Sequence, residues 1–544
     1  MKVTLYKILF DKREEFLAQL KKEYKNERTI QKGYKEKSLT VTLYIDDQEK
    51  SGSPNWQWVV DELESDINLT MRSAPKGIVI IDVDDEQYAL SFSYAYHCVS
   101  KYADKDFAFS FARKIDFKEI KRTAKVAPHS SKNKMVDAFK DNRQFIFDSG
   151  EAYLKINLVE KLPKGFGIYK PNIEIGDALT VDLVKNCLES IFDLIFHVKQ
   201  VIDSDKAEQK IPILKKIGKE DPIKLERLDN NFLQKINDSE MRIYLSDFDI
   251  AGNVEEFKDY SNDYSLHYKR KKEIIKNLEI ETIRNFIEKH EIKGIEVFNI
   301  KIGKFIDNKI IKYTLKEILD YTDEDEHCTL FGGDWYSYNL DYLDYLKESL
   351  AEIPVVYYPE YDFSLKKHEN YCSLKYEQEK QNKRYQGKTE EQIKKSIKNR
   401  YYKEFFYNTW LAETNSHFKN YDTKLAKLPD KTVIEVADIH CQASHTLFAV
   451  KIGNTSSKLS YAITQSIASL EAIKIKSIKF EKDLDRIGLW IVLDMKNKLP
   501  EVESGKPDIN ALEMFVFKNY LDSWKKFVLH QSKQPILHIN YITD

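Results

Sequence analysis

The stretch 'KTVIEVADIHCQASHTLFAVKIG', residues 431–453, decides the fold class of the C-terminal part of this chain. Its apolar residues form two short runs on either side of a polar turn, a pattern that predicts a pair of strands. Glu435 and Asp438 fall on the first predicted strand, and Lys451 closes the second. Two readings are open for these residues: a metal-dependent nuclease centre, or a polar sheet edge with a salt bridge across the hairpin.

Helical and strand-like segments alternate around this hairpin. A helix that includes 'YNTWLAE' (407–413) is predicted before it, and 'SSKLSYAITQSIASLEAI' (456–473) has helical spacing after it. A strand 'GLWIVLD' (488–494), a helix 'ALEMFVFKNYLDSWKKFVL' (511–529) and a strand 'PILHINYI' (535–542) follow. The predicted order is helix, strand, strand, helix, strand, helix, strand, which favours a mixed sheet flanked by helices.

The whole chain has 544 residues, too many for one ordinary core, and we expect an α/β, multi-domain protein of mixed α+β character. Residues 1–125 alternate strand-like and helix-like text, including the hairpin 'GIVIIDVDDEQYALSFSY' (77–94). Residues 126–325 mix amphipathic helices with short strands. We therefore predict domains at 1–125, 126–325 and 326–544.

Composition limits the cellular compartment and the binding partners that we expect for this chain. Charged residues make up 32% of the chain but the net charge is −2, so any nucleic-acid surface has to be local. No apolar run approaches the length of a membrane span, and we expect a cytoplasmic protein with no membrane contact. The five cysteines lack a C-x-x-C pair, which favours reduced thiols.

Two basic segments are candidates for such a surface. Lysine runs are commonly solvated faces, but residues 113–134 and 380–403 interleave the charge with loop-forming residues or tyrosines. Cations could follow phosphates there, while Tyr385, Tyr401 and Tyr402 could stack on bases. The predicted nucleic-acid-binding residues are Lys121, Arg122, Lys383, Arg384, Lys394, Lys395, Lys398 and Arg400.

The C-terminal order, with an acid on one strand and a lysine on its neighbour, resembles the core of restriction-endonuclease-like nucleases. The resemblance implies that Asp438 is the central ligand of a Mg²⁺ ion, that Lys451 is the catalytic lysine, and that Glu404 is an accessory acid. The match has a defect, because Ala449 stands two residues before the lysine, where that fold has an acid or glutamine. Glu435 could replace it only if a bulge turned it to the face of Asp438.

Stretches along nearly the whole chain resemble a bacterial family described as sporadically distributed, a domain of unknown function found near restriction and phage-defence genes. They include 'VTLYKIL' (3–9), 'DFAFSFARKIDFKEIKR' (106–122), 'GDWYSYNLDYL' (333–343), 'LFAVKIGNTSSKLSYAITQS' (447–466) and 'ILHINYI' (536–542). Ala449 and Tyr461 stand where the family pattern has histidines. These two departures remove potential ligands or bases, so the resemblance implies a member that binds without cutting.

Three smaller features complete the set of candidates. His440, Cys441 and His445 lie close together, as do His368 and Cys372, and either group could hold zinc, although neither has a recognised second ligand pair. Gly332-Gly333 precede Trp335 and Tyr336, a pattern that predicts a turn delivering both rings into a core.

The resulting hypothesis is an antiphage-defence protein that binds nucleic acid, DNA in preference to RNA, through its C-terminal half. It would be either a Mg²⁺-dependent nuclease or a decayed nuclease kept for binding. The alternative is a non-enzymatic sensor or scaffold that recognises a phage protein or assembles a partner defence complex. Salt-dependent retention of nucleic acid separates the two.

Overall fold

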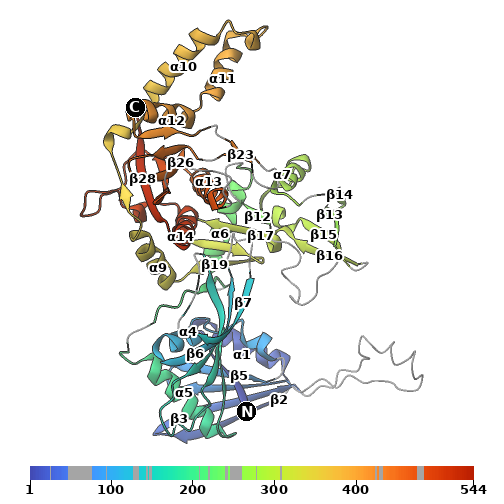
Figure 1. Ribbon diagram of the computed structural model, residues 1–544. Helices are drawn as coiled ribbons and strands as arrows, with labels where there is room; N and C mark the ends of the chain where they lie inside the picture. Colours follow the sequence, from blue (N-terminus) through green and yellow to red (C-terminus); the bar gives the residue numbers. More distant parts are fainter. Residues whose placement is uncertain are drawn as a thin grey trace, which may run out of the picture. The chain divides into compact units, whose positions relative to one another are not determined.

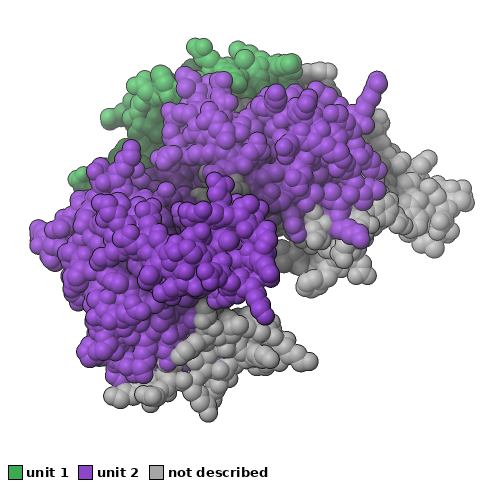
Figure 2. Space-filling model, turned by 90° about the horizontal axis from the view of Figure 1, so that it is seen from above, with its two compact units in different colours: residues 1–147, 151–216 green, residues 148–150, 217–544 purple. Residues whose placement is uncertain are grey.

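A computed structural model divides the chain into two compact units, both of mixed α/β structure, as predicted (Figure 2). The first unit comprises residues 1–147 and 151–216, and the second comprises residues 148–150 and 217–544. The predicted boundary at residue 125 falls inside strand β6 (Phe117–Val126). The predicted boundary at residue 325 falls in the turn between the paired strands β17 (Leu319–Asp323) and β18 (Cys328–Phe331). The described residues are 1–24, 26–46, 76–92, 95–126, 134–142, 145, 147, 150–206, 209–218, 221–238, 243–245, 260–276, 278–306, 309–422, 425–427, 433–435, 437–474 and 483–544.

The first unit is built on an antiparallel sheet with the strand order β2-β3-β4-β5-β1-β10-β9-β8-β6-β7 among its described residues (Figure 1). The predicted hairpin is confirmed as β4 and β5, which pair up to Val83 and Glu86 around a two-residue turn. The elements are β1 (Lys2–Lys7), α1 (Arg13–Glu23), β2 (Asn26–Tyr34), β3 (Lys37–Asp46), β4 (Lys76–Val83), β5 (Glu86–Phe92), α3 (Tyr96–Val99), α4 (Phe107–Lys114), β6 (Phe117–Val126), β7 (Lys134–Asn142), β8 (Ala152–Glu160), β9 (Asn172–Ile175), β10 (Leu179–Asp182), α5 (Leu188–Ile202) and β11 (Leu214–Lys216).

Helices cover both faces of this sheet. Side chains alternate along each strand, so that Tyr88 and Leu90 of β5 join the core formed with α4 and α5. Ala89, between them, joins a second core that contains Phe16 and Leu20 of α1. Because both faces of the central strands are buried, their sequences are nearly continuous apolar runs and do not alternate between apolar and polar residues.

A buried carboxyl group gives the first unit a pH-dependent stability. Glu160, at the end of β8, is buried and accepts a hydrogen bond of 2.9 Å from the Tyr169 hydroxyl. Burial raises the pKa of Glu160 to about 7, although this hydrogen bond opposes the shift. The folded chain therefore keeps a proton between pH 4.5 and 7 that the unfolded chain releases.

We expect the free energy of unfolding of the first unit to fall as pH rises through this window, by up to about 3 kcal/mol, and to level off above it. Glu160→Gln should flatten this dependence and stabilise the unit at pH 8. Denaturant unfolding at pH 5 and pH 8 measures the effect, with the exposed Glu14→Gln as the matched control. A Glu160→Gln variant that keeps the wild-type pH dependence would contradict the assignment.

The second unit begins with two small antiparallel sheets. Their described strands have the orders β14-β13-β15-β16 and β19-β18-β17-β12, and α6 and α7 contribute to the core they share. The elements are α6 (Pro222–Lys235), β12 (Tyr244–Leu245), β13 (Tyr260–Tyr268), β14 (Lys271–Ile275), α7 (Ile280–Lys289), β15 (Lys301–Ile306), β16 (Lys309–Thr314), α8 (Leu315–Ile318), β17 (Leu319–Asp323), β18 (Cys328–Phe331) and β19 (Asp334–Tyr338).

The predicted glycine turn is confirmed in this region. Gly332 and Gly333 connect β18 to β19 with φ values of 59° and 85°, a conformation that side chains disfavour. Trp335 is buried in the core of the two sheets, with 1% of its surface exposed. Tyr336 is only half-buried, so the prediction that both rings enter the core was wrong for this residue. Neighbouring residues of a strand point to opposite faces.

The C-terminal part of the second unit is a mixed sheet with helices on both faces. Its described strands have the order β20-β28-β27-β26-β25-β22, in which β20, β28, β27 and β26 are parallel and β25 and β22 are antiparallel to their neighbours. The elements are α9 (Leu340–Ala351), β20 (Val355–Val356), β21 (Phe363–Ser364), α10 (Leu365–Glu379), α11 (Glu390–Arg400), α12 (Lys403–Thr414), β22 (Phe418–Asn420), β23 (Leu425–Lys427), β24 (Val433–Glu435), β25 (Ile439–Cys441), β26 (Thr446–Gly453), α13 (Ser456–Lys474), β27 (Arg486–Leu493), α14 (Phe515–His530) and β28 (Gln534–Thr543).

Side chains of α12 pack on one face of this sheet. Tyr407 and Leu411 of α12 join a core with Val450 of β26 and Trp490 of β27. Helix α13 contacts β26 and β27, and α14 contacts β28. The two connections β26-α13-β27 and β27-α14-β28 each join parallel strands through a helix, as in other α/β folds.

The first strand of the opening hairpin differs from the prediction. It is divided into β24, which pairs with β23 in a separate small sheet, and β25, which pairs with β26. Glu435 ends β24, and Asp438 lies just before β25. The expectation that both acids share one strand was therefore wrong.

Two predicted properties can be compared directly with the structure. Among the described residues, no helix combines the length and apolarity needed to cross a membrane. All five cysteines are free thiols, which agrees with the absence of a C-x-x-C pair.

Candidate functional site

Glu404 and Lys451 come together at the N-terminal end of α12. Glu404 lies in the first turn of this helix, and its Oε1 atom is 2.9 Å from the Nζ atom of Lys451 on β26. The Lys451 ammonium group also lies 5.2 Å from the centre of the Tyr461 ring on α13. The predicted catalytic lysine thus has a carboxylate partner in the protein itself, which offsets its charge.

Asp438 is buried beside the same strand, and both of its carboxylate oxygens accept hydrogen bonds. Oδ2 accepts from the Val450 N–H at 2.7 Å, and Oδ1 accepts from the Asn408 amide at 3.3 Å. The Asp438 N–H itself donates to the Phe448 carbonyl at 3.1 Å. Since β25 begins only at the next residue, Ile439, the carboxylate provides the acceptor that a further strand residue would have offered to Val450.

Two residues that the sequence analysis missed complete this cluster. The Asn408 amide also donates to Oδ2 of Asp422 at 3.4 Å, and the Tyr402 hydroxyl donates to Oδ1 of Asp422 at 3.3 Å. Asn408 is fully buried on α12, four residues after Glu404. Residues four apart share a helix face, so this spacing is a signal that could have identified Asn408, whereas nothing in the sequence singles out Asp422.

These residues do not fit a Mg²⁺ ion as they stand. Magnesium takes oxygen ligands in octahedral geometry, with carboxylates free to face the ion. Asp438 uses both oxygens to accept N–H groups, Glu404 pairs with Lys451, and the buried Ala449 has no ligating group. Within the described part of the chain, no group of three His, Cys, Asp or Glu residues could hold a metal. The side chain of Glu435 lies outside the described part.

Three of the proposed zinc ligands, His368, Cys372 and His440, are engaged in protein contacts. The His368 Nε2 donates to the Tyr401 carbonyl at 2.8 Å, and the Cys372 thiol is 3.4 Å from the same nitrogen. Burial raises the pKa of Cys372, which disfavours the thiolate that metals bind. His440 contacts the ring of Tyr421.

Most of the basic stretch 380–403 belongs to a helical hairpin, which we call the arm and define as residues 365–400. Helices α10 and α11 form the hairpin, with a short 3-10 turn, Lys383–Tyr385, at its tip. Figure 1 shows α10 and α11 projecting from the C-terminal sheet. Ile393 and Ile397 of α11 pack with buried tyrosines against α10 to form a small core. The arm therefore has packing of its own.

The arm concentrates positive charge in a chain that is nearly neutral. It carries eleven lysines and arginines and five glutamates, and therefore a net charge of +6, against −2 for the chain. Lys394 pairs with Glu390 at 2.6 Å, and Arg400 lies 3.4 Å from Glu379. The exposed cations of the arm with no acid at ion-pair distance among the described residues include Lys383, Arg384, Lys395 and Lys398.

The second predicted basic segment lies in the first unit. Lys121 and Arg122 are exposed on β6, next to a register shift in its pairing with β7 and β8. Lys121 lies 3.8 Å from Glu119. Lys125 is buried and pairs with Glu151 at 2.7 Å, so part of this segment's charge serves the fold.

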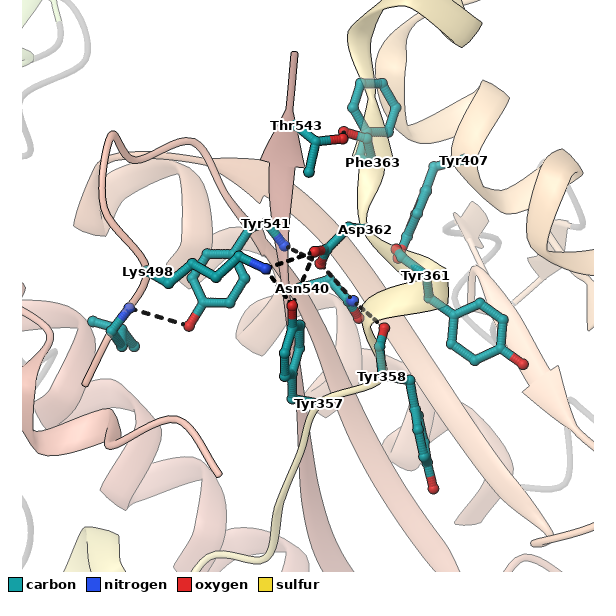
Figure 3. A network of polar contacts seen from close by, with 11 residues as sticks. Tyr357, Tyr358, Tyr361, Asp362, Phe363, Tyr407, Lys498, Asn540, Tyr541 and Thr543 are labelled. Atoms are coloured by element: carbon teal, nitrogen blue, oxygen red, sulfur yellow. Dashed lines mark hydrogen bonds and ion pairs between the residues drawn. The ribbon is translucent and has the colours of Figure 1, made fainter. Parts of the chain in front are cut away.

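A network that the sequence did not indicate surrounds Asp362, between β20 and β21 (Figure 3). Four groups donate to its carboxylate at 3.0 Å each: the Tyr357 hydroxyl, the Lys498 ammonium, the Asn540 amide and the Tyr541 N–H. Hydrogen bonding to Tyr357, against the effect of burial, raises the pKa of Lys498. With its acceptor sites filled, Asp362 ties two loops to β28 and offers little to a ligand.

A family model described as a family of unknown function, DUF6119, matches residues 1–487. No curated protein and no solved structure matches the chain.

Proposed function

We propose that this chain, which belongs to the DUF6119 family of unknown function, binds nucleic acid through its arm. The observation that carries the proposal is the set of exposed cations that have no acid at ion-pair distance in the described part of the chain, on a helical hairpin of net charge +6. The phosphates of nucleic acid are closely spaced anions, and each one bound by a lysine or arginine releases counterions. The rest of the chain does not supply a comparable field, because its acids outnumber its bases.

The mixed C-terminal sheet also supports the proposal of nucleic-acid binding. A helix, α12, precedes the antiparallel pair β25 and β26, and α13, β27, α14 and β28 follow in the order expected for a restriction-endonuclease-like core, although β22, β23 and β24 are additional strands before this pair. Glu404, Asp438 and Lys451 are grouped around β26. Such a core would act here as a platform for binding in antiphage defence. Glu404 pairs with Lys451, and Asp438 accepts a hydrogen bond from the backbone of β26. Because these groups are already engaged with one another and with the backbone, we propose that the chain binds nucleic acid without cutting it.

Binding by lysine and arginine needs no metal, which leads to a test. We expect the purified chain to bind labelled DNA equally well with Mg²⁺, Mn²⁺ or chelator, and to leave plasmid, linear DNA and RNA intact in all three conditions. Fluorescence anisotropy and gel electrophoresis measure the two properties.

Asp438→Ala should lower the unfolding free energy by about 1–3 kcal/mol, because the buried Val450 N–H loses its acceptor, and should leave binding unchanged.

Cutting that requires a metal and disappears in both Asp438→Ala and Lys451→Ala would contradict this account and identify a working nuclease. Cutting that survives both substitutions would place the chemistry elsewhere. The alternative function, a sensor or scaffold that recognises a phage protein or a defence partner, predicts that nucleic acid is not retained at any salt concentration. Retention that weakens steeply with salt separates the proposal from that alternative.

A further inference from the structure

The arrangement of tyrosines in the arm points to the kind of nucleic acid it takes. Proteins that bind single strands offer exposed aromatic faces on which bases stack, in addition to positive charge. Tyr385 and Tyr401, which the sequence analysis assigned to stacking, are buried with 5% and 7% of their surface exposed. Both hydroxyl groups donate to Glu379 on α10. These two tyrosines therefore hold the arm together and are not available to bases.

The ring faces in the arm are also covered by its own cations. Lys375 lies over Tyr371 and over Tyr401, at 5.3 and 5.6 Å from the ring centres. The other pairs, at 5.2 to 5.7 Å, are Arg384 and Lys388 on Tyr385, Lys380 and Lys394 on Tyr376, and Arg400 on Tyr401. Charge held on a ring has fewer rotamers to lose on binding. The arm thus presents positioned cations rather than stacking surfaces.

Resting on the proposed function, we infer that the arm binds the phosphate backbone of a double helix and does so independently of sequence. Helix α11 has 11 residues and spans about 16 Å, roughly half a turn of duplex. Lys395 and Lys398, three residues apart, lie on neighbouring positions of its surface. A duplex also has a higher charge density than a single strand, so the same contacts release more counterions from it.

The expected preference follows from this difference. The salt dependence is about −0.9 per phosphate contact on duplex and about −0.7 on a single strand. For four contacts at 0.15 M salt, the duplex is favoured by roughly five-fold. Stacking of even one base would reverse this order, because it contributes about 1–3 kcal/mol to single-strand binding.

The experiment measures the affinity of the full chain for 24-base-pair DNA duplexes of two unrelated sequences, for the matching single strand, and for the RNA duplex. We expect equal affinities for the two DNA sequences and weaker binding of the single strand. The RNA duplex shows whether the backbone recognised is that of DNA, of RNA or of both. Single-strand binding as tight as duplex binding, or a strong sequence preference, would overturn the inference.

A variant outside the arm makes the test independent of arm folding. Tyr402 is 42% exposed beside the arm, and Tyr402→Ala should leave duplex affinity within two-fold of wild type. A loss of single-strand binding larger than the loss of duplex binding in this variant would indicate stacking and contradict the inference. If no nucleic acid of any kind binds, the proposed function itself fails. If nucleic acid binds but the duplex is not preferred, only the inference about the duplex fails.

Discussion

Replacing Lys383, Arg384, Lys395 and Lys398 by glutamate is expected to lower the affinity for nucleic acid by about 10³-fold at 0.15 M salt. Each phosphate contact contributes a factor of about five to six at this concentration, since the affinity scales with salt to the power of about −0.9 per contact. The slope of log affinity against log salt should become smaller by about 3.6 for four lost contacts. Anisotropy titrations of a labelled duplex at several salt concentrations measure both quantities.

The matched control changes the net charge equally in another part of the second unit. Arg270, Lys272, Lys276 and Lys293 are exposed, and their replacement by glutamate should leave the affinity within a few-fold of wild type. Circular dichroism and thermal unfolding show whether the arm variant keeps its fold; the core residues Ile393 and Ile397 are untouched. Equal losses in both variants would mean that overall charge, rather than the arm, governs binding.

The second large effect concerns stability. Trp335→Ala is expected to lower the unfolding free energy of the second unit by about 3–5 kcal/mol, as for other buried aromatic side chains. Its ring packs edge-on against Tyr321, and its indole N–H donates to Oδ1 of Asp229 at 2.7 Å. Asp229 also accepts from Lys316 at 2.7 Å, so the substitution leaves a cavity and removes one donor from a network. Denaturant unfolding followed by circular dichroism measures the loss.

Trp335→Phe divides this effect into its parts. Phenylalanine fills most of the volume but cannot donate to Asp229, so we expect a cost of about 1.5–3 kcal/mol, the contribution of a hydrogen bond to a charged group. If Trp335→Ala unfolded like wild type but no longer bound nucleic acid, the residue would have a binding role and the packing assignment would be wrong.

The pattern of apolar residues was sufficient for the fold class. It identified the β4–β5 hairpin and the order of strands and helices from β26 to β28. These features depend on neighbours in the chain, through side-chain alternation in strands and helical spacing. The division of 431–441 into β24 and β25 was not visible, because strand breaks depend on which partner strand offers hydrogen bonds.

For the candidate site, the sequence indicated residue types but not their partners. The grouping of Glu404 with Lys451 was predicted only by resemblance, and the roles of Asn408 and Asp422 were not seen. Asp438 reads as a candidate ligand in the sequence, whereas the register of β26 gives its carboxylate the Val450 N–H to accept. A carboxylate is chemically the same in both roles, so only its surroundings distinguish them.

The sequence by itself determined that this chain has a mixed α/β fold and a strongly basic segment before its C-terminal hairpin, because composition and periodicity are local properties. Only the tertiary structure decided which way the side chains of that segment face. Tyr385 and Tyr401 are buried because α10 packs against α11. Glu379 accepts hydrogen bonds from both hydroxyl groups, although the two tyrosines lie 6 and 22 positions further along the chain. Burial is a property of the packed hairpin as a whole, and a sequence pattern of alternating lysine and tyrosine fits an exposed stacking surface as well as a core capped by cations.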